Sequence, residues 1–265
     1  MASIGFIGAG RMAEAMIKGL IARGVYSKDD VVACAPSEET RKRVSSLGVG
    51  MYESAGEVAG LADILVLAVK PKHVQGLFES EGLKLKKSHL LISIAAGITI
   101  ETLKSYVPDS RIVRVMPNHC CAVLEGAAGF ARGNATDDDI ELVKRIFSAT
   151  GLAVEVRERD MDAVTGVSGS SPAFVYMFLR AVVKAGTGAG LTEDVATKLA
   201  AQSLVGAGRM ALETGMTPEA LVDNVCSPGG TTIEGVKVLD AGGFEELVEK
   251  AVSASVERSK EMSGR

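Results

Sequence analysis

The stretch that decides the fold is Ser3-Ile4-Gly5-Phe6-Ile7-Gly8-Ala9-Gly10-Arg11-Met12-Ala13. An apolar run ends at Gly8 and helical spacing of apolar residues begins at Met12, so a G-x-G-x-x-A pattern joins a strand to a helix. In that context the pattern is typical of dinucleotide binding. Gly8 permits the tight turn, Gly10 lets a diphosphate approach the backbone, and Ala13 allows close packing of the helix. A plain strand–helix turn is the alternative.

Strand and helix patterns alternate through the first part of the chain. Strands are predicted at residues 3–7, 31–34, 64–69, 90–94, 111–116 and 152–156, and helices at 12–23, 37–47 and 137–150. Strands separated by helices predict an α/β fold of the Rossmann type, with a doubly wound, mainly parallel sheet. We therefore expect residues 1–158 to form a dinucleotide-binding domain.

Only helical patterns follow residue 158. Helices are predicted at residues 160–191, 192–214, 231–240 and 244–259, with another beginning at 217 and a kink in the first at 168–172. Their apolar faces are wide, and a domain of this size would bury them poorly alone. We therefore predict an all-α domain, residues 159–265, that packs against a second copy of the chain. Burial of these faces against the first domain is the alternative.

Composition limits the partners of this 265-residue chain. The formal net charge is −4, which argues against nucleic acid or an anionic membrane surface. The most apolar stretch, 172–183, contains Arg180 and is shorter than the about 20 residues that a membrane span needs. The four cysteines follow no secretory signal and include no C-x-x-C pair. We expect reduced thiols in a cytoplasmic protein, and no metal site.

The end of the second strand bears on the choice of dinucleotide. Enzymes that use NAD usually carry an acid there, which bonds the ribose hydroxyls. This chain has Ala35 instead, so a 2′-phosphate could be accepted by Ser37, Thr40 and Arg41, although two neighbouring glutamates oppose it. The sequence favours NADPH, with NADH as the alternative.

Three further motifs follow predicted strands: Ala68-Val69-Lys70-Pro71, Ala95-Ala96-Gly97, and Asn118 after Met116-Pro117. Because open α/β sheets bind ligands at the carboxyl ends of their strands, we expect these motifs to line one crevice. Lys70 is either a catalytic acid or a cation near the cofactor phosphate or ribose, and the second reading is favoured.

A last motif lies in the helical part. Pro228 ends one helix, Gly229 and Gly230 free the backbone, and Thr231 and Thr232 open the next helix. The unpaired N–H groups of such a helix start suit a carboxylate. Asn224 and Ser227 add side-chain donors nearby. The alternative is an ordinary helical corner with a threonine cap.

Taken in order, these segments resemble the pyrroline-5-carboxylate reductase family. The likeness is carried by residues 227–232, 162–173 and 238–244 and by the Gly-Ala-Gly, Ala-Val-Lys-Pro, Ala-Ala-Gly and Met-Pro-Asn motifs, and it covers essentially the whole chain. The resemblance implies a Rossmann domain followed by a helical dimerisation domain, with homodimers assembled into a decamer of five dimers. It also implies reduction of 1-pyrroline-5-carboxylate to L-proline by hydride transfer from NAD(P)H.

The resemblance also assigns roles to residues. Thr232 is implied as the catalytic residue that bonds the ring nitrogen. The substrate residues are Asn224, Ser227, Gly229, Gly230, Thr231 and Thr232. The cofactor residues, from the motifs and the resemblance together, are Gly8, Ala9, Gly10, Arg11, Met12, Ser37, Ala68, Val69, Lys70, Pro71, Ala95, Ala96, Gly97, Asn118 and Glu158. This chain departs from the family at His119-Cys120, where the family has Thr-Pro, and at Ser171, where it often has Gly.

Four other functions are alternatives. A reductase of a related cyclic imine would use the same site. A β-hydroxyacid dehydrogenase would need a catalytic lysine beside an asparagine, and Lys184 has no such neighbour. A deazaflavin-dependent NADP reductase would explain the amino-terminal half but not Ser227–Thr232. A non-catalytic dinucleotide sensor would bind cofactor without turnover.

Overall fold

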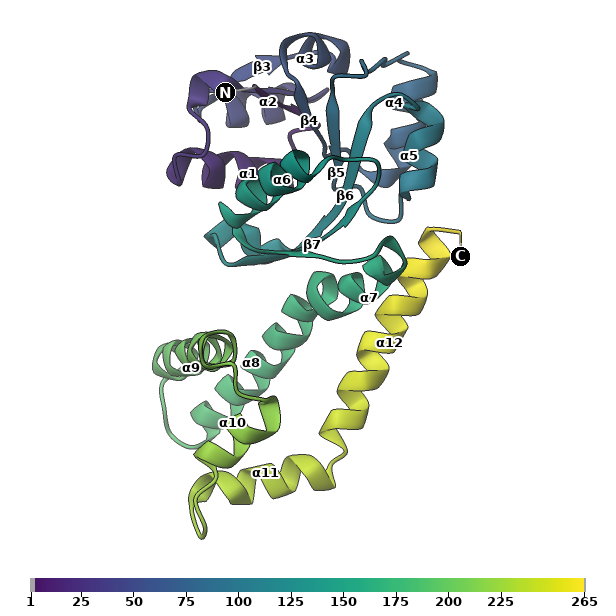
Figure 1. Cartoon of the computed structure of the whole chain (residues 1–265). Helices are drawn as coiled ribbons and strands as arrows, with labels where there is room; N and C mark the ends of the chain where they lie inside the picture. Colours follow the sequence, from purple (N-terminus) through teal and green to yellow (C-terminus); the bar gives the residue numbers. More distant parts are fainter. Residues whose placement is uncertain (1–2, 265) are drawn as a thin grey trace. The chain divides into compact units, whose positions relative to one another are not determined.

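The computed structural model describes residues 3–264, which form two compact units (Figure 1). One unit runs to Ser170 and includes the chain again from Ala254, and the other is Ser171–Ser253. The last helix, α12 (Phe244–Met262), therefore contributes residues to both. The domain boundary predicted at residue 158 stays a prediction.

Within residues 3–264, eight strands form a single sheet in the order β3-β2-β1-β4-β5-β6-β7-β8. The strands are β1 (Ile4–Ile7), β2 (Val31–Cys34), β3 (Gly50–Tyr52), β4 (Ile64–Leu67), β5 (Leu90–Ser93), β6 (Arg111–Pro117), β7 (Gly126–Arg132) and β8 (Gly151–Glu155). All neighbours are parallel except β6 and β7. The predicted doubly wound, mainly parallel sheet is confirmed.

Helices cover both faces of this sheet (Figure 1). One face packs on α1 (Arg11–Ala22), α2 (Glu38–Ser45) and α6 (Asp137–Ser148), and the other on α3 (Ala55–Leu61), α4 (Val74–Glu79) and α5 (Ile100–Tyr106). In β4, Ile64 and Val66 belong to the first layer while Leu65 and Leu67 belong to the second. Because β4 is buried on both faces, its sequence is a continuous apolar run.

Two strands were not predicted, and each has a physical reason. β3 is only three residues long. β7 begins Gly-Ala-Ala-Gly, and such small residues carry a weak strand signal. Their size is required, because a Cβ added to Gly129 would lie 2.6 Å from a methyl group of Val164. Because a helix approaches β7 closely at this point, the strand cannot carry the large residues that would have indicated it.

The remaining elements are helical. They are α7 (Met161–Val164), a π-helical stretch (Thr165–Ser170), α8 (Ser171–Gly188), α9 (Glu193–Thr214), α10 (Pro218–Val225), α11 (Thr231–Ala241) and α12. Short 3₁₀ helices lie at Lys28–Asp30, Pro71–His73, His119–Val123 and Glu158–Asp160. The kink predicted at 168–172 corresponds to the π-helical stretch. Among the helices of residues 3–264, none is long and apolar enough to cross a bilayer.

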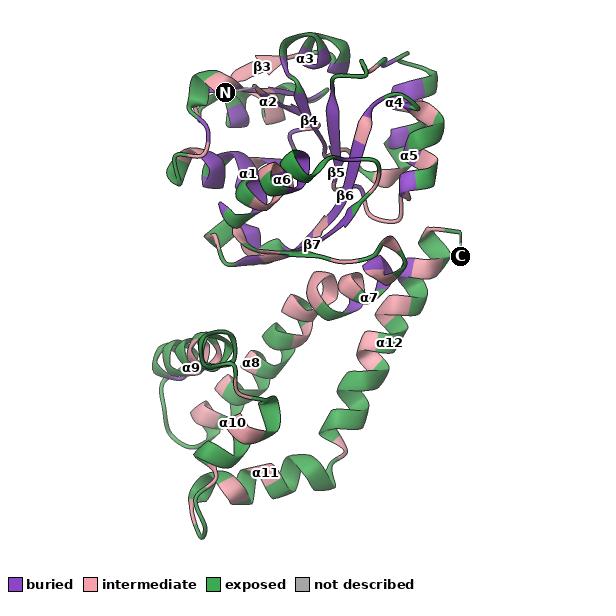
Figure 2. Ribbon diagram, in the orientation of Figure 1, coloured by how far each residue is buried: buried purple, intermediate pink, exposed green. Residues whose placement is uncertain are grey.

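The predicted wide apolar faces are present and uncovered within the chain. Figure 2 shows mostly exposed and intermediate residues along α8 to α11, in contrast to the buried strands. Within Ser171–Ser253, Ala196 is the single buried residue. The apolar faces of Ser171–Ser253 are therefore not covered within that unit.

Candidate functional site

The loop after β1 has the geometry that a diphosphate requires. Gly8 has a φ of +94°, and a Cβ there would lie 2.9 Å from the backbone of Ala68 and Val69, so only glycine fits. A Cβ added to Gly10 meets nothing within 4 Å, which leaves open space in front of α1. Ala13 is fully buried against the sheet. The tight turn at Gly8 and the close packing of Ala13 are therefore as predicted, while the approach of a diphosphate at Gly10 stays a prediction.

Six of the helices with eight or more residues have a described N-cap, and these six starts fall into two groups. In α2, α6, α9 and α10, a serine or threonine at the N-cap accepts a hydrogen bond from the helix backbone. By contrast, α1 and α11 begin at Gly10 and Gly230, and neither start has a side-chain cap. A helix start without a cap keeps its free N–H groups and its positive dipole end for another partner. These two starts are the ones that the sequence assigns to phosphate and carboxylate.

The loop after β2 carries a positive charge where an acid would select NAD. Arg41 donates hydrogen bonds from Nη1 to the carbonyl oxygens of Ala35 (2.9 Å) and Pro36 (3.0 Å). Its Nη2 lies 3.7 Å from a carboxylate oxygen of Glu53. Ser37 caps α2 by accepting from the N–H of Thr40, which leaves its own hydroxyl proton to donate. This loop can accept a 2′-phosphate.

A cavity of about 320 Å³ lies at the ends of the first strands. Gly8 and Val69, both predicted to contact cofactor, line it, and so does Cys34, whose thiol pKa is raised by burial. Lys72 and His73 also line it, and the sequence did not predict them. They directly follow the Ala68–Pro71 motif, so an extension of that motif by two residues would have included them. The volume of this cavity is within the range of small-molecule sites, and it lies at the strand ends where cofactor contact is predicted.

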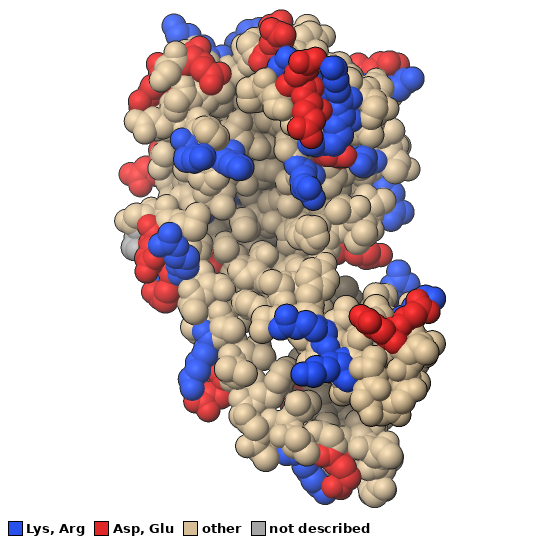
Figure 3. All heavy atoms as spheres, turned by 180° about the vertical axis from the view of Figure 1, so that it is seen from behind, with Lys and Arg blue, Asp and Glu red and all other residues tan. Residues whose placement is uncertain are grey.

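The outer face of α1 is basic. Arg11, Lys18 and Arg43 line a cavity of about 330 Å³ together with Glu14. Hydrogen bonds from Lys18 (2.7 Å) and Arg43 (2.8 Å) hold the pKa of Glu14 below its ordinary value. Three cations against one carboxylate leave this helix start net positive. On the face drawn in Figure 3, acidic and basic side chains occur both side by side and in separate groups.

The loop after β5 is held by a carboxylate. Glu158 accepts a hydrogen bond at 2.6 Å from the N–H of Ile100, at the start of α5. The same oxygen lies 3.3 Å from Nη1 of Arg114, a buried side chain of β6. Glu158, predicted to contact cofactor, is thus also a bridge between the end of β8 and the Ala95–Gly97 loop.

Asn118 likewise holds backbone at the end of β6. Its Oδ1 accepts from the N–H groups of Cys120 and Ala127, both at 3.1 Å, and its Nδ2 donates to the carbonyl of Ser168 at 3.2 Å. Both acceptor sites of the side chain are therefore engaged within the protein. One N–H of the amide remains for the predicted cofactor contact.

The corner between α10 and α11 is a tight turn. Gly230 donates its N–H to the carbonyl of Ser227 at 3.0 Å, and Gly229 has a φ of +71°. A Cβ on Gly230 would lie 2.6 Å from Oγ of Ser227, so a larger residue cannot replace it without movement. Thr231 and Thr232 are exposed, and their hydroxyls make no hydrogen bond within residues 3–264. The alternative reading of Thr231 or Thr232 as a helix cap is wrong, because Gly230 is the N-cap.

Known proteins resemble the chain throughout its length. The family described as pyrroline-5-carboxylate reductase dimerisation matches residues 158–262, and the family described as NADP oxidoreductase, coenzyme F420-dependent, matches residues 3–97. The pyrroline-5-carboxylate reductase of Arabidopsis thaliana is 39% identical over 98% of this chain and 95% of its own. The chain belongs to the pyrroline-5-carboxylate reductase family.

Solved structures agree with this membership. A pyrroline-5-carboxylate reductase from Coxiella burnetii superposes with a TM-score of 0.91 at 36% identity, over 99% of this chain and 98% of the other. The Plasmodium falciparum pyrroline carboxylate reductase with NADP bound superposes with a TM-score of 0.86 at 32% identity, again over 99% and 98%. The match of residues 3–97 to the coenzyme F420-dependent family explains why that family was a rival for the amino-terminal half alone.

The two groups of predicted site residues lie in different units of this family member. Gly8 to Gly97, Asn118 and Glu158 belong to the sheet-containing unit, whereas Asn224 to Thr232 belong to Ser171–Ser253. Within the first unit the sheet register aligns the strand ends, since Ile7 lies opposite Leu67 and Leu67 lies opposite Ser93. The cofactor residues that follow β1, β4 and β5 are therefore brought to one edge.

Proposed function

We propose that this chain reduces 1-pyrroline-5-carboxylate to L-proline with NADPH as the hydride donor. The observation that carries the proposal is the pair of helix starts at Gly10 and Gly230, which have no protein cap in a chain that belongs to this family throughout its length. One start suits a diphosphate and the other suits a small carboxylate.

The residues present fit a dinucleotide. The open space at Gly10 admits a diphosphate, and the N–H groups at the start of α1 donate to it. Ser37 and Arg41 favour NADPH over NADH at the 2′ position. When bound, the cofactor supplies the hydride. We propose that these residues hold it: Gly8, Ala9, Gly10, Arg11, Met12, Ser37, Ala68, Val69, Lys70, Pro71, Ala95, Ala96, Gly97, Asn118 and Glu158.

The helical corner would hold the substrate. N–H groups at the start of α11 and the side chains of Asn224, Ser227 and Thr231 bind the carboxylate, with Gly229 and Gly230 shaping the turn. Thr232 bonds the ring nitrogen through a hydroxyl that the described protein leaves unused. A cyclic imine near neutral pH can arrive already protonated, so hydride addition to the iminium carbon gives the amine directly and Thr232 needs only to orient the nitrogen. The product amine then takes a second proton from solvent, which Thr232 can pass to it. Orientation within about 3–3.5 Å supplies much of the rate gain.

Assembly follows from the same proposal. We propose a domain of residues 1–158 and a helical domain of residues 159–265, with a homodimer formed through the helices and five dimers in a decamer. The uncovered apolar residues of α8 to α12 support the dimer. The four cysteines are free thiols in the structure, which is in keeping with a cytoplasmic protein. We propose no nucleic-acid or membrane partner.

The direct test is an assay of NADPH oxidation with pyrroline-5-carboxylate, run beside NADH, β-hydroxyacids with NADP⁺, and six-membered cyclic imines. The proposal predicts NADPH-dependent formation of L-proline. Activity on hydroxyacids alone would reject it. A preference for the six-membered imine would instead make the chain a reductase of a related cyclic imine. The departures at His119, Cys120 and Ser171 bear on this choice of substrate.

A further inference from the structure

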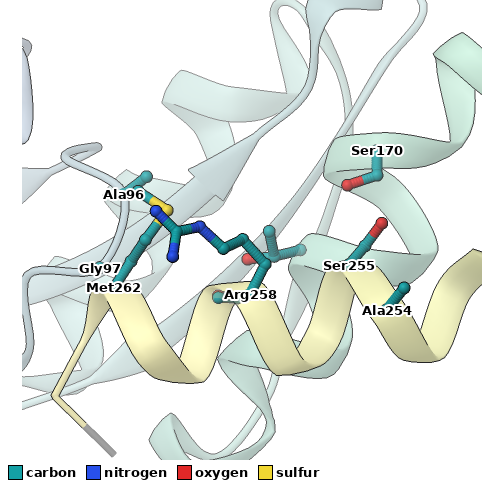
Figure 4. A pocket seen from close by; sticks show the side chains of 9 residues that line it. Ala96, Gly97, Ser170, Ala254, Ser255, Arg258 and Met262 are labelled. Atoms are coloured by element: carbon teal, nitrogen blue, oxygen red, sulfur yellow. The ribbon is translucent and has the colours of Figure 1, made fainter.

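The last turn of α12 lies directly against the Ala95–Gly97 loop. Gly97 has a φ of +77°, and a Cβ built there would lie 3.2 Å from the carbonyl oxygen of Met262. Beside this contact is a cavity of about 360 Å³, lined by Ala96, Gly97, Arg258, Ser259 and Met262. Figure 4 shows the Arg258 side chain extending toward Ala96 from α12. The backbone of the loop therefore rests on the backbone of a helix more than 150 residues away in sequence.

A buried hydrogen bond fixes that helical turn. Ser259 donates from Oγ to Oδ1 of Asp162 at 2.8 Å, and the two residues are 6% and 3% exposed. The bond spans 97 residues and lies in the sheet-containing unit. Without this donor, the buried carboxylate of Asp162 would lower the folding stability of the protein or would have to move. The bond therefore restrains α12 strongly.

The partner of Ser259 belongs to the segment that holds the other end of the loop. Glu158, four residues before Asp162, accepts the N–H of Ile100 at 2.6 Å. One short segment thus restrains residues 95–100 twice, directly through Glu158 and indirectly through Asp162, Ser259 and the turn that contacts Gly97. Both routes end on the loop that follows β5, at the ligand-binding edge of the sheet.

We propose that Asp162 and Ser259 are positioning residues for the cofactor: they hold the last turn of α12 as a support that keeps the Ala95–Gly97 loop in its binding conformation. The inference rests on the proposed function, in which this loop contacts NADPH. Asp162 and Ser259 act through the loop and need not touch cofactor or substrate themselves. Ordering a loop during binding costs free energy and so lowers the affinity for NADPH. A loop that is already ordered carries no such cost.

The test measures NADPH affinity by the fluorescence of the bound cofactor, on the full chain in its native assembly. Ser259→Ala removes the hydroxyl. Ser259→Thr keeps it, and the adjacent cavity has room for the added methyl group. Lys260→Ala is the matched control, because it breaks only the exposed ion pair with Glu257 in the same turn. Loss of one hydrogen bond predicts an increase of about 3- to 10-fold in the NADPH dissociation constant for Ser259→Ala.

The expected pattern is weaker NADPH binding by Ser259→Ala, affinity near that of the unmodified protein for Ser259→Thr and Lys260→Ala, and a KM for the imine that stays constant. Hydrogen exchange of residues 95–100 should also rise in Ser259→Ala alone, which gives a readout independent of turnover. Unchanged affinity and exchange in Ser259→Ala would overturn the inference, as would failure of Ser259→Thr to restore both. An unmodified protein that binds NADPH but does not reduce pyrroline-5-carboxylate would reject the proposed substrate and leave this test intact.

Discussion

The two compact units differ in how far their apolar residues are buried. In the sheet-containing unit, the strands β1, β4 and β5 are almost wholly buried, and helices cover both faces of the sheet. In Ser171–Ser253, Leu212 and Val238 are 73% and 71% exposed, and Ala196 alone is buried. Soluble monomers rarely leave such large apolar surface uncovered. The first unit completes its own core, whereas the apolar residues of Ser171–Ser253 are left without one inside their own unit.

The units agree, however, in one detail. Each contains a longer helix that begins at a glycine without a side-chain cap, α1 in the first and α11 in the second. The helices α2, α6, α9 and α10 are instead capped by serine or threonine, so a start without a side-chain cap is not general in either unit. The two units therefore differ in how their apolar residues are buried but share a helix start without a side-chain cap. These two features can be tested separately.

The largest effect is expected from a charge on the uncovered face. Leu247→Asp places a carboxylate on α12 where the side chain is 66% exposed in the single chain. If a partner covers this face, the buried and unpaired charge costs about 3–5 kcal/mol and separates the dimer. Sedimentation analysis measures the change. Leu61→Asp, at a site 50% exposed in the sheet-containing unit, is the control and should leave the assembly intact. Equal behaviour of the two variants would remove the contrast between the units.

The next largest effect is expected at Thr232, whose hydroxyl makes no hydrogen bond within the described residues, and is compared with that at Thr192, which caps a helix. Thr232→Ala removes an unused hydroxyl and should lower turnover by about 100- to 1000-fold, the range for a donor that acts in the transition state, with NADPH affinity unchanged. Thr192→Ala removes the cap of α9 and should cost about 1 kcal/mol of stability without a change in turnover. Steady-state kinetics and thermal unfolding separate these outcomes. Parallel loss of turnover and NADPH affinity in Thr232→Ala would contradict its assigned role.

A smaller effect distinguishes two glycines in one loop. Gly8→Ala forces a positive φ on alanine and a contact at 2.9 Å, so it should destabilise the fold by about 1–3 kcal/mol. Gly10→Ala meets no protein atom within 4 Å and should keep stability, but its methyl group occupies space needed by the diphosphate. NADPH affinity should therefore fall in Gly10→Ala with no loss of melting temperature. Normal NADPH binding by that variant would place the diphosphate elsewhere.

The smallest effect is a pH dependence confined to the sheet-containing unit. His89 is buried and its Nδ1 accepts the N–H of Lys86 at 3.0 Å; burial, followed by the charge of Lys86, lowers its pKa below the ordinary 6.5. The unfolded chain therefore binds a proton more readily, and the free energy of unfolding should fall as the pH drops below about 6.5. His89→Asn should flatten that part of the curve. An identical slope in the variant would assign the acid sensitivity to other groups.

The sequence predicts the sheet-containing unit well where residues are large and poorly where they are small. Continuous apolar runs such as Ile64–Leu67 identify buried strands, and Thr217-Pro218 locates a helix start. β7 stayed hidden because Gly129 must be small beneath Val164. For the site, the Gly8–Ala13 and Ser227–Thr232 motifs are local, so the sequence displays them. Lys72 and His73 are recognised only once the cavity is seen, and Asp162 and Ser259 only once their long-range hydrogen bond is known.

The central claim is that hydride passes from a cofactor held by the first unit to an imine held by the corner of the second. The most direct measurement is a crystal structure of the native assembly with NADPH and L-proline bound. The account predicts the nicotinamide C4 about 3–3.5 Å from the ring carbon beside nitrogen, with Thr232 hydrogen-bonded to that nitrogen. A structure in which the Ser227–Thr232 corner lies far from every bound nicotinamide would contradict it.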